Sequence, residues 1–525
     1  MIHADVLGER ARLSPQRLAL VFVPTGERLT YAALDARARR MALALTGGLG
    51  LRPGDRIGLL AHNAVEFVDA VFAAAKAGLV LVPLSTRATA KELEGIVTDS
   101  GMRALVYDGA FVPLVSALRG AVPVEAWIAM HGDQRSSASD GTLAGLLAGV
   151  ADADVAALAH AARREARPDP ESPLFLLYTS GTTGRPKGVI VPHRMVAWNA
   201  YNTALCWQLR EDDVSPIFTP LYHAGGLGAF LLPILAAGGT IVLHRGFDPA
   251  EVWHVIARER CTVVLGVPTI WKLLADAPAF ATTDLSSVRW LISGGAPLPR
   301  VLIDTYQARG VTFKQGYGLT EVGVNCFSMS VEESVTKAGT IGRPMMFTQA
   351  RCVGPEGDDV PPGEVGELWL RGPHVCRGYW NDPEATRQAL DADGWFHTGD
   401  LAKCDEDGFF TIAGRKKDMI ISGGVNVYPA EIEATLAAHP AVADSAVVGV
   451  PDETWGEVGV AFVVRAPGAS VDATALSAHV LESLAKYKLP RQFVFVEALP
   501  RTPYGKVVKD ELRQAYLAGR LAGRP

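Results

Sequence analysis

The sequence contains few cysteines, and no two of them have the spacing of a metal-binding or redox pair. Its 525 residues include six cysteines, none in a Cys-x-x-Cys arrangement. This argues against a disulfide framework and against a cysteine-based zinc site. Residues 1–20 also lack the apolar core of a secretory signal, because acidic and basic side chains occur throughout. We therefore expect a cytoplasmic protein with reduced thiols.

The sequence also lacks an excess of positive charge. Lys and Arg number 50 against 56 for Asp and Glu, which gives a formal net charge of -6. Such a balance attracts neither nucleic acid nor an anionic membrane surface. Any anionic ligand must therefore be held by a local site.

One stretch without charge is long enough to cross a bilayer. Residues 224–243 carry no charged side chain, but they contain Pro233 and five glycines. Two of these glycines, Gly238 and Gly239, precede a strand-like run at 240–243. We predict a buried helix, a turn and a strand here, and no membrane span.

Short apolar runs alternate with longer amphipathic ones from about residue 55. Residues 56–60 read as a strand, 65–77 as a helix and 79–82 as the next strand. Further strands of this kind are predicted at 175–178, 240–243, 261–265 and 288–292. Continuous apolar strands between helices indicate an α/β fold with mainly parallel sheets covered on both faces. Residues 132–170 read as a surface excursion.

The pattern becomes β-rich after residue 363 and ends in a compact α+β segment. Strands are predicted at 367–370 and 409–412. Beyond Arg415 the order is a helix at 429–438, strands at 445–450 and 460–464, a helix at 476–485 and a strand at 492–496. We predict a large N-terminal domain, residues 1–414, with a β-rich subdomain, and a small mobile C-terminal domain, residues 415–525.

The strongest local signal is the loop Tyr178–Gly188, which follows a predicted buried strand. Its glycines let backbone amides approach a ligand closely, and its hydroxyls and lysine add donors and positive charge. Such a loop suits a polyphosphate, but it is not a Walker A loop because no Gly-Lys-[Ser/Thr] follows at the required spacing. The predicted phosphate ligands are Thr179, Ser180, Gly181, Thr182, Thr183, Gly184 and Lys187.

Here the sequence resembles the adenylate-forming superfamily, which includes acyl- and aryl-CoA synthetases, firefly-type luciferases and adenylation domains of peptide synthetases. The resemblance covers nearly the whole chain, because further family motifs recur in order at 315–321, 394–400, 414–418 and 500–506. It implies an AMP-forming acyl-CoA synthetase that uses ATP, Mg²⁺ and coenzyme A. A carboxylic acid would first form an acyl-adenylate, which the CoA thiol would then attack.

Residues 315–321 offer chemistry suited to a nucleotide, and the resemblance assigns the same roles. Tyr317 presents an aromatic face for adenine, Thr320 a hydroxyl for the α-phosphate, and Glu321 a hard oxygen ligand for Mg²⁺. Thr179 is predicted as a second metal ligand. The remaining predicted nucleotide contacts are Gln315, Gly316 and Gly318, with a wall against adenine formed by Gly294, Gly295 and Ala296.

Asp400 closes a Thr-Gly-Asp sequence that we read as a turn. A carboxylate there can accept from both ribose hydroxyls, and Arg415 can hold the same sugar. The alternative is a structural Asp that caps its own turn.

The resemblance gives the last domain two tasks. Lys506 would reach the substrate carboxylate and the α-phosphate during adenylation, and Lys417 would be the hinge between two orientations. Gly423 and Gly424 would leave room for the pantetheine arm of CoA. Trp455 would act in the second step, unless it is only a packing residue.

His223 falls where the family places an aromatic gate between the ATP and acyl sites. The resemblance counts it with Lys506, Thr320 and Glu321 among the catalytic residues, although adenylation needs little acid–base work from it. The alternative is a histidine that only packs.

The acyl pocket is predicted to be wide and mostly apolar, which favours a bulky acid over acetate. Its expected lining is Gly225, Gly226, Leu227, Gly294, Gly295, Val322 and Asn325. A medium- or long-chain fatty acid and an aryl or arylpropenoic acid both remain open. So do an enzyme that loads a carrier-protein thiol, a luciferase-like oxygenase and a non-catalytic nucleotide sensor. A homodimer is possible.

Overall fold

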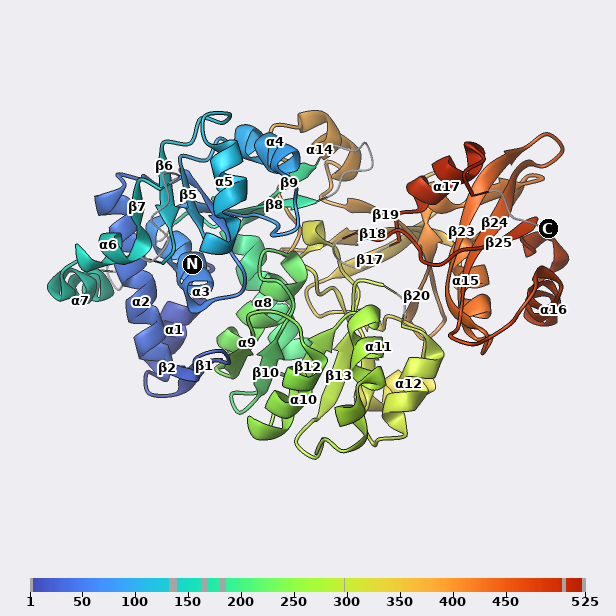
Figure 1. The fold of residues 1–525 in the computed structure, drawn as a ribbon, viewed down its shortest axis with the longest axis horizontal. Helices are drawn as coiled ribbons and strands as arrows, with labels where there is room; N and C mark the ends of the chain where they lie inside the picture. Colours follow the sequence, from blue (N-terminus) through green and yellow to red (C-terminus); the bar gives the residue numbers. More distant parts are fainter. Residues whose placement is uncertain are drawn as a thin grey trace.

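The structure is a computed structural model that describes residues 3–131, 139–161, 168–179, 186–296, 298–502 and 507–521. A large body made of several sheets with helices around them is followed by a small body that contains the end of the chain (Figure 1). The predicted α/β class, with a large N-terminal and a smaller C-terminal domain, is confirmed.

The first sheet of the large body has the strand order β7-β6-β5-β3-β4-β8-β9. Its pairs are parallel except for β8 with β9, which are antiparallel. The strands are β3 (Arg56–Leu60), β4 (Val80–Pro83), β5 (Ala104–Tyr107), β6 (Ala126–Ala129), β7 (Gly141–Thr142), β8 (Pro173–Thr179) and β9 (Lys187–Pro192).

Two further sheets lie below the first in Figure 1. One has the order β10-β11-β1-β2 and the other, wholly parallel, the order β12-β13-β14. Their strands are β1 (Leu18–Phe22), β2 (Glu27–Thr30), β10 (Val214–Ile217), β11 (Thr240–Leu243), β12 (Val263–Gly266), β13 (Trp290–Ser293) and β14 (Phe313–Gln315). The strands predicted at 240–243, 261–265 and 288–292 are therefore confirmed within two residues.

Helices cover these sheets because their apolar side chains need a surface to pack on. Helix α3 (Val65–Ala77) matches its prediction at both ends; it is buried nearly all round and ends at Gly78 with φ +68°. The others are α1 (Val6–Leu13), α2 (Tyr31–Leu43), α4 (Ala90–Ser100), α5 (Val112–Leu118), α6 (Leu143–Ala148), α7 (Asp152–Ala161), α8 (His193–Cys206), α9 (Leu232–Ala237), α10 (Pro249–Arg258), α11 (Pro268–Asp276) and α12 (Arg300–Gln307). The excursion predicted at 132–170 thus contains strand β7 and helices α6 and α7.

The uncharged stretch 224–243 folds as the sequence predicts. A π-helical segment, Gly225–Leu231, runs into α9, Gly238 turns the chain at φ +93°, and β11 follows. Across the described ranges of the chain, no helix has the length and apolar character needed to cross a bilayer.

A β-rich subdomain follows, with the antiparallel order β17-β18-β19-β20. Its elements are β15 (Phe327–Ser328), α13 (Val331–Thr336), β16 (Arg343–Pro344), β17 (Gln349–Val353), β18 (Gly366–Arg371), α14 (Pro383–Ala389), β19 (Phe396–Cys404) and β20 (Phe410–Arg415). In Figure 1 this sheet lies between the large body and the small one.

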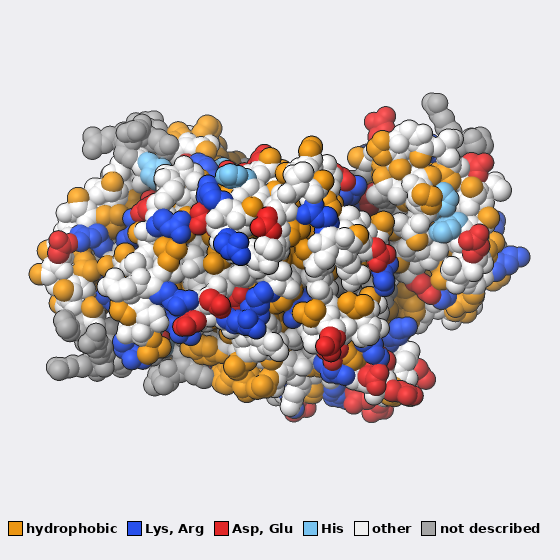
Figure 2. Space-filling view, turned by 90° about the horizontal axis from the view of Figure 1, so that it is seen from below, with side chains coloured by type: hydrophobic (Ala, Val, Ile, Leu, Met, Phe, Trp, Pro, Cys, Tyr) orange, Lys and Arg blue, Asp and Glu red, His pale blue; other side chains and the backbone are white. Residues whose placement is uncertain are grey.

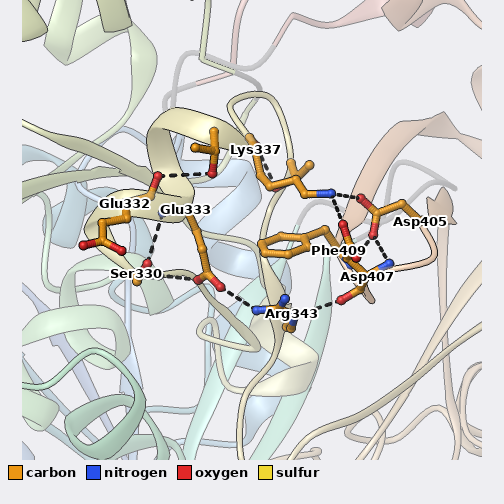
Figure 3. Close-up of polar contacts among 10 residues, drawn as sticks. Ser330, Glu332, Glu333, Lys337, Arg343, Asp405, Asp407 and Phe409 are labelled. Carbon is orange, nitrogen blue, oxygen red and sulfur yellow. Dashed lines mark hydrogen bonds and ion pairs between the residues drawn. The ribbon is translucent and has the colours of Figure 1, made fainter.

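A cluster of charges anchors the β19–β20 hairpin to the chain around α13 (Figure 3). Lys337 Nζ contacts Asp405 at 2.8 Å and Asp407 at 2.6 Å. The ring of Phe409 lies between Lys337 Nζ, 5.0 Å from its centroid, and the Arg343 guanidinium, 4.0 Å away. These cation–π and ion-pair contacts fix the hairpin whose far ends carry Asp400 and Arg415.

The small body has its own sheet and its own apolar core. Its strand order is β22-β21-β24-β23, with β25 parallel to β24. Its elements are β21 (Ile420–Ser422), β22 (Val425–Val427), α15 (Pro429–Ala437), β23 (Val442–Asp452), β24 (Gly456–Arg465), α16 (Ala473–Ser483), β25 (Gln492–Phe495) and α17 (Lys509–Leu517). Separate apolar clusters fill the two faces of this sheet. The chain passes from the sheet of the β-rich subdomain to the sheet of the small body across a single 3-10 turn, Lys416–Asp418.

Charges of both signs are spread over the surface. On the face shown in Figure 2, Lys and Arg side chains are interspersed with Asp and Glu among apolar and neutral groups. This fits the near-balanced composition of the sequence.

Candidate active site

The predicted phosphate loop joins the antiparallel strands β8 and β9. Thr179 ends β8 and stands opposite Lys187 at the start of β9, so the pair closes the base of the loop. Gly188 packs closely on Tyr178, because a Cβ at Gly188 would lie 3.0 Å from the tyrosine ring. The predicted ligands Ser180, Gly181, Thr182, Thr183 and Gly184 lie outside the described residues.

Tyr379 links the phosphate loop to the predicted metal ligand. Its backbone pairs with Val189 of β9, its ring lies 5.2 Å from Lys187 Nζ, and its hydroxyl donates to Glu321 Oε1 at 3.1 Å. The backbone of Glu321 is held by the amide of Cys376 at 2.8 Å. Burial, and next the neighbouring Glu321 carboxylate, raises the pKa of Tyr379, so the hydroxyl stays protonated and keeps donating.

Tyr317, Asp400 and Arg415 form a second connected group. The Tyr317 hydroxyl donates to Asp400 Oδ2 at 2.6 Å, and Arg415 Nε contacts Asp400 Oδ1 at 2.7 Å. The ion pair follows from strand register, since Asp400 and Arg415 are cross-strand neighbours in β19 and β20. Burial, reinforced by the Asp400 carboxylate, raises the pKa of Tyr317 well above its usual value.

The turn predicted at Asp400 is wrong, because Asp400 lies inside β19 and its side chain is buried. The Thr-Gly-Asp sequence looks like a turn because the strand is irregular here: Gly399 takes φ +68°, and the strand pairing shifts register between Leu401 and Ala402. The Asp400 carboxylate therefore does not cap a turn; it is bound by the side chains of Tyr317 and Arg415.

The predicted adenine wall adjoins the motif that follows β14. Ser293, at the end of β13, pairs with Gln315, at the end of β14, and the amide of Gly316 donates to the Ser293 carbonyl at 2.8 Å. Gly294 continues directly from this pair. Gly295 takes φ +81° and is exposed, as is Ala296. Parallel strands bring their carboxyl ends to one edge, which is the usual position for ligand sites in such sheets.

A tight backbone turn presents Thr320 and Glu321. A Cβ at Gly318 would lie 2.2 Å from the Val324 carbonyl oxygen, so only glycine fits there. Val324 itself takes φ +71°, a region that β-branched residues rarely adopt. Backbone strain of this kind is commonly found at functional sites.

His223 lies in a turn between β10 and the π-helical segment. Its ring Nδ1 accepts a hydrogen bond from the amide of Gly225 at 3.1 Å, and its side chain is partly buried. The ring is therefore held by its own turn. Both the gating role and the packing role remain predictions.

An apolar cavity lies between β8, β9, α8, α9 and the Thr320 turn. Its polar side chains are Asn199 and Thr320. The complete lining is Phe175, Leu177, Val191, Met195, Val196, Asn199, Ala224, Leu227, Gly228, Leu232, Thr320, Gly323 and Val324. Since Thr320 belongs to the predicted nucleotide motif, the cavity is the best candidate for the acyl pocket.

The sequence predicted only one residue of this lining, Leu227. Asn325 is buried elsewhere, where its Nδ2 donates to Thr203 Oγ1 and to the Ala229 carbonyl, both at 3.0 Å. Gly226 serves packing, because a Cβ there would lie 2.3 Å from the Pro220 carbonyl oxygen.

The predicted residues of the small body lie at its surface. Lys417 Nζ is 3.8 Å from Asp510, with both side chains largely exposed. Trp455 is 53% exposed, and its ring packs over Gly423, where a Cβ would lie 2.8 Å from the indole. A Cβ at Gly424 would meet nothing within 4 Å. Lys506 lies outside the described residues.

Sequence reasoning missed two residues of the site, Tyr379 and Asn199. Tyr379 stands 58 positions from the Glu321 that it contacts, so no spacing rule connects them. Asn199 lies on a helix whose other side chains are mostly apolar or packed, and only the cavity reveals it.

The fold, a large α/β body followed by a small α+β body, is that of an adenylate-forming enzyme. It matches the ATP-bound MatB structure from Rhodopseudomonas palustris with a TM-score of 0.86 and 33% identity, over 98% of this chain and 99% of that one. Residues 7–380 match the model of the AMP-binding enzyme family, and residues 431–506 match the AMP-binding enzyme C-terminal domain. The chain belongs to the family of AMP-binding enzymes.

Curated relatives align along almost the entire chain. A feruloyl-CoA synthase from an Amycolatopsis species is 41% identical over 513 residues, 97% of each chain. The long-chain-fatty-acid–CoA ligase FadD13 of Mycobacterium tuberculosis is 38% identical over 519 residues, 98% of each. The protein is an AMP-forming acid–thiol ligase of the acyl-CoA synthetase type, and membership of this family implies the use of ATP and CoA.

Proposed function

We propose that the protein converts a bulky, mainly apolar carboxylic acid into its CoA thioester. The observation that carries this proposal is the apolar cavity with Thr320 on its lining. The cavity measures about 30 Å³ in this structure, narrower than the sequence predicts, so it would have to widen to take the apolar part of an acid, whose carboxylate would then lie beside Thr320, the predicted contact of the α-phosphate. The names of the two curated relatives, a feruloyl-CoA synthase and a long-chain-fatty-acid–CoA ligase, support an acyl group much larger than acetyl.

In the first half-reaction, a carboxylate oxygen attacks the α-phosphorus of ATP. The bond from that phosphorus to the β-phosphate bridging oxygen breaks, and pyrophosphate leaves. Lys187 and the phosphate loop would hold the leaving pyrophosphate, Thr320 would position the α-phosphate, and Lys506 would offset the charge of the two anions that meet. His223 would separate the acyl and nucleotide compartments.

The nucleoside would lie across the edge formed by β13, β14 and β19. Tyr317 would stack on adenine against the wall at 294–296, beside Gln315, Gly316 and Gly318. Asp400 would accept from the ribose hydroxyls. The Tyr317 and Arg415 contacts support this role, because they fix the carboxylate in one orientation before the nucleotide binds.

Magnesium would be held by Glu321 and Thr179 together with ATP phosphate oxygens. Within the described residues, no three His, Cys, Asp or Glu side chains group to form a metal site. The available donors nevertheless fit Mg²⁺, which is commonly bound by one or two protein oxygens, phosphates and water. The metal would supply charge neutralisation on the phosphates.

In the second half-reaction, the CoA thiolate attacks the acyl carbonyl carbon and AMP leaves. We place the hinge at Lys417 and the domain boundary just after Arg415, one residue beyond the 414/415 boundary that the sequence predicts, since Arg415 ends β20 and the chain enters the next sheet across Lys416–Asp418. Gly423, Gly424 and Trp455 would border the thiol path. About half of the Trp455 side-chain surface is exposed, which suits a residue that would contact the ligand in only one of the two domain orientations.

The test is an assay of AMP release with ATP, Mg²⁺, CoA and a panel of aliphatic and aromatic acids, together with acid-dependent exchange of labelled pyrophosphate into ATP. We expect both signals with a bulky acid and neither with acetate. Failure of exchange with every acid would contradict the proposed reaction. AMP release without consumption of CoA would point to a carrier-protein thiol. Cytoplasmic location and a homodimer stay predictions.

A further inference from the structure

Asn199 lines the candidate acyl cavity and carries an unpaired acceptor. Its side chain is 3% exposed, and its Oδ1 is buried without a hydrogen-bond partner among the described residues. Asn199 lines the cavity, as does the adjacent Gly323, where a Cβ would lie only 3.1 Å from Oδ1. Buried polar atoms are nearly always paired in folded proteins, so an unpaired carbonyl in a cavity calls for a donor from outside the protein.

The orientation of the Asn199 amide is fixed by its other end. Its Nδ2 donates to the Gly228 carbonyl at 2.7 Å. Turning the amide over would place its oxygen against that carbonyl oxygen and lose this bond. Oδ1 is therefore the atom left to receive a ligand.

Two other buried polar side chains of α8, Asn202 and Thr203, have partners within the protein, whereas both ring nitrogens of His193 at its first position have none among the described residues. Asn202 Nδ2 donates to Thr348 Oγ1 at 3.2 Å, and its Oδ1 accepts from the amide of Phe347 at 3.3 Å. Thr203 Oγ1 accepts from Asn325 at 3.0 Å. Of the two α8 side chains with unpaired buried atoms, Asn199 and His193, only Asn199 lines the cavity.

Apart from Thr320, the other side chains that line the cavity are apolar. Val196, Leu227 and Leu232 offer a ligand neither a donor nor an acceptor. A plain alkyl chain would pack against the apolar wall but leave Asn199 Oδ1 unpaired. A flat ring with one hydroxyl would pack against the wall and also donate a hydrogen bond to Oδ1. Deep acceptors of this kind discriminate strongly, because the analogue that lacks the donor leaves a buried group without a partner.

We propose that Asn199 is a specificity-determining residue whose Oδ1 accepts a hydrogen bond from a phenolic hydroxyl of the substrate, which makes the preferred substrate a hydroxyaryl carboxylic acid. This proposal rests on the proposed function, because it assumes that the cavity holds the acyl group. It assigns no chemical step to Asn199.

The test compares two acids that differ only in the hydroxyl: 4-hydroxycinnamic acid and cinnamic acid. We expect the wild-type kcat/KM for AMP release to favour the hydroxylated acid by roughly tenfold or more. In Asn199→Leu, which keeps the branched side-chain shape but replaces the amide oxygen and nitrogen by methyl groups, that ratio should fall close to one through loss of activity on the hydroxylated acid. Asn202→Leu is the matched control: it can lower stability, but it should keep the wild-type ratio.

The wild-type ratio decides the question even where a variant folds poorly. Equal use of the two acids, or a preference for octanoic acid over both, would overturn the proposal while leaving the proposed function in place. An unchanged ratio in a folded Asn199→Leu protein would overturn the role of Asn199. Lack of pyrophosphate exchange with any acid would instead remove the proposed function itself, and this inference with it.

Discussion

The candidate residues of the large body are bound to one another, whereas those of the small body are only loosely attached. Asp400 is buried between Tyr317 and Arg415, and Glu321 is held through Tyr379. In the small body, the ion pair of Lys417 is long and exposed, and half of the Trp455 surface is open.

This contrast fits two different demands on one enzyme. A nucleotide site gains from side chains that are fixed before the ligand binds, because less ordering remains to be done in the complex. A domain that must present first a lysine and then a thiol path cannot be fixed in one place. Its candidate residues therefore need to be free of strong contacts with the large body.

The largest expected effect comes from the small body. We expect Lys506→Ala to lower adenylation by about 100-fold or more, since a cation that stabilises developing charge is lost. Thioester formation from supplied acyl-adenylate should remain largely intact. The two half-reactions can be measured separately by pyrophosphate exchange and by single-turnover thioester formation.

Lys509→Ala is the matched control for this charge change. Its Nζ pairs with Glu433 at 2.7 Å within the small body, so its removal should leave both half-reactions nearly unchanged. An equal fall of both half-reactions in Lys506→Ala would contradict the division of labour between the two bodies.

The second prediction concerns the hinge. We expect Lys417→Pro to slow one half-reaction by roughly tenfold or more while sparing the other, because proline fixes its own φ and disfavours the helical geometry of Lys416 in the 3-10 turn. Lys417→Ala loses only the weak contact with Asp510 and should be nearly neutral. Unchanged rates in Lys417→Pro would move the hinge elsewhere.

The third prediction tests the connected site of the large body. We expect Tyr379→Phe to lower adenylation about fivefold to tenfold, because Glu321 loses one charge-assisted hydrogen bond while the ring over Lys187 remains. The Mg²⁺ concentration needed for half-maximal exchange should rise.

Tyr178→Phe removes a comparable hydroxyl that does not contact Glu321: it donates to Asp99 Oδ2 at 2.5 Å. It should not alter the Mg²⁺ dependence. If the Tyr379→Phe enzyme had lower activity but an unchanged Mg²⁺ dependence, Tyr379 would act only through packing and not through Glu321.

The sequence predicted the elements of this fold well and the contacts within the site poorly. Strands such as β3 and helix α3 are continuous or periodic apolar runs, so their positions follow from local pattern. The bond between Tyr317 and Asp400 joins residues 83 positions apart and depends on how two sheets pack. Asn325, predicted to line the acyl pocket, does not line the candidate cavity; its Nδ2 instead donates to Thr203 Oγ1 and to the Ala229 carbonyl, contacts that no local pattern foretells.

The smallest expected effect on rate is at a buried charge in the large body that the site does not use. Lys314 in β14 is 6% exposed, and its Nζ lies 4.8 Å from the Trp290 ring. Burial, with a smaller contribution from Arg289, lowers the pKa of Lys314 to about 8. Near neutral pH the buried ammonium therefore costs stability, on the order of 3 kcal/mol at about 1.4 kcal/mol per pKa unit.

Because the folded pKa lies below the unfolded one, the unfolded chain binds more protons between about pH 8 and 10.5. This cost therefore shrinks as the pH rises through that window. We expect Lys314→Met to raise Tm at pH 7 by about 2–5 °C, less at pH 9.5, with little change in adenylation rate. Calorimetry at the two pH values measures the difference, and a shift of equal size at both would mean that charge burial is not its cause.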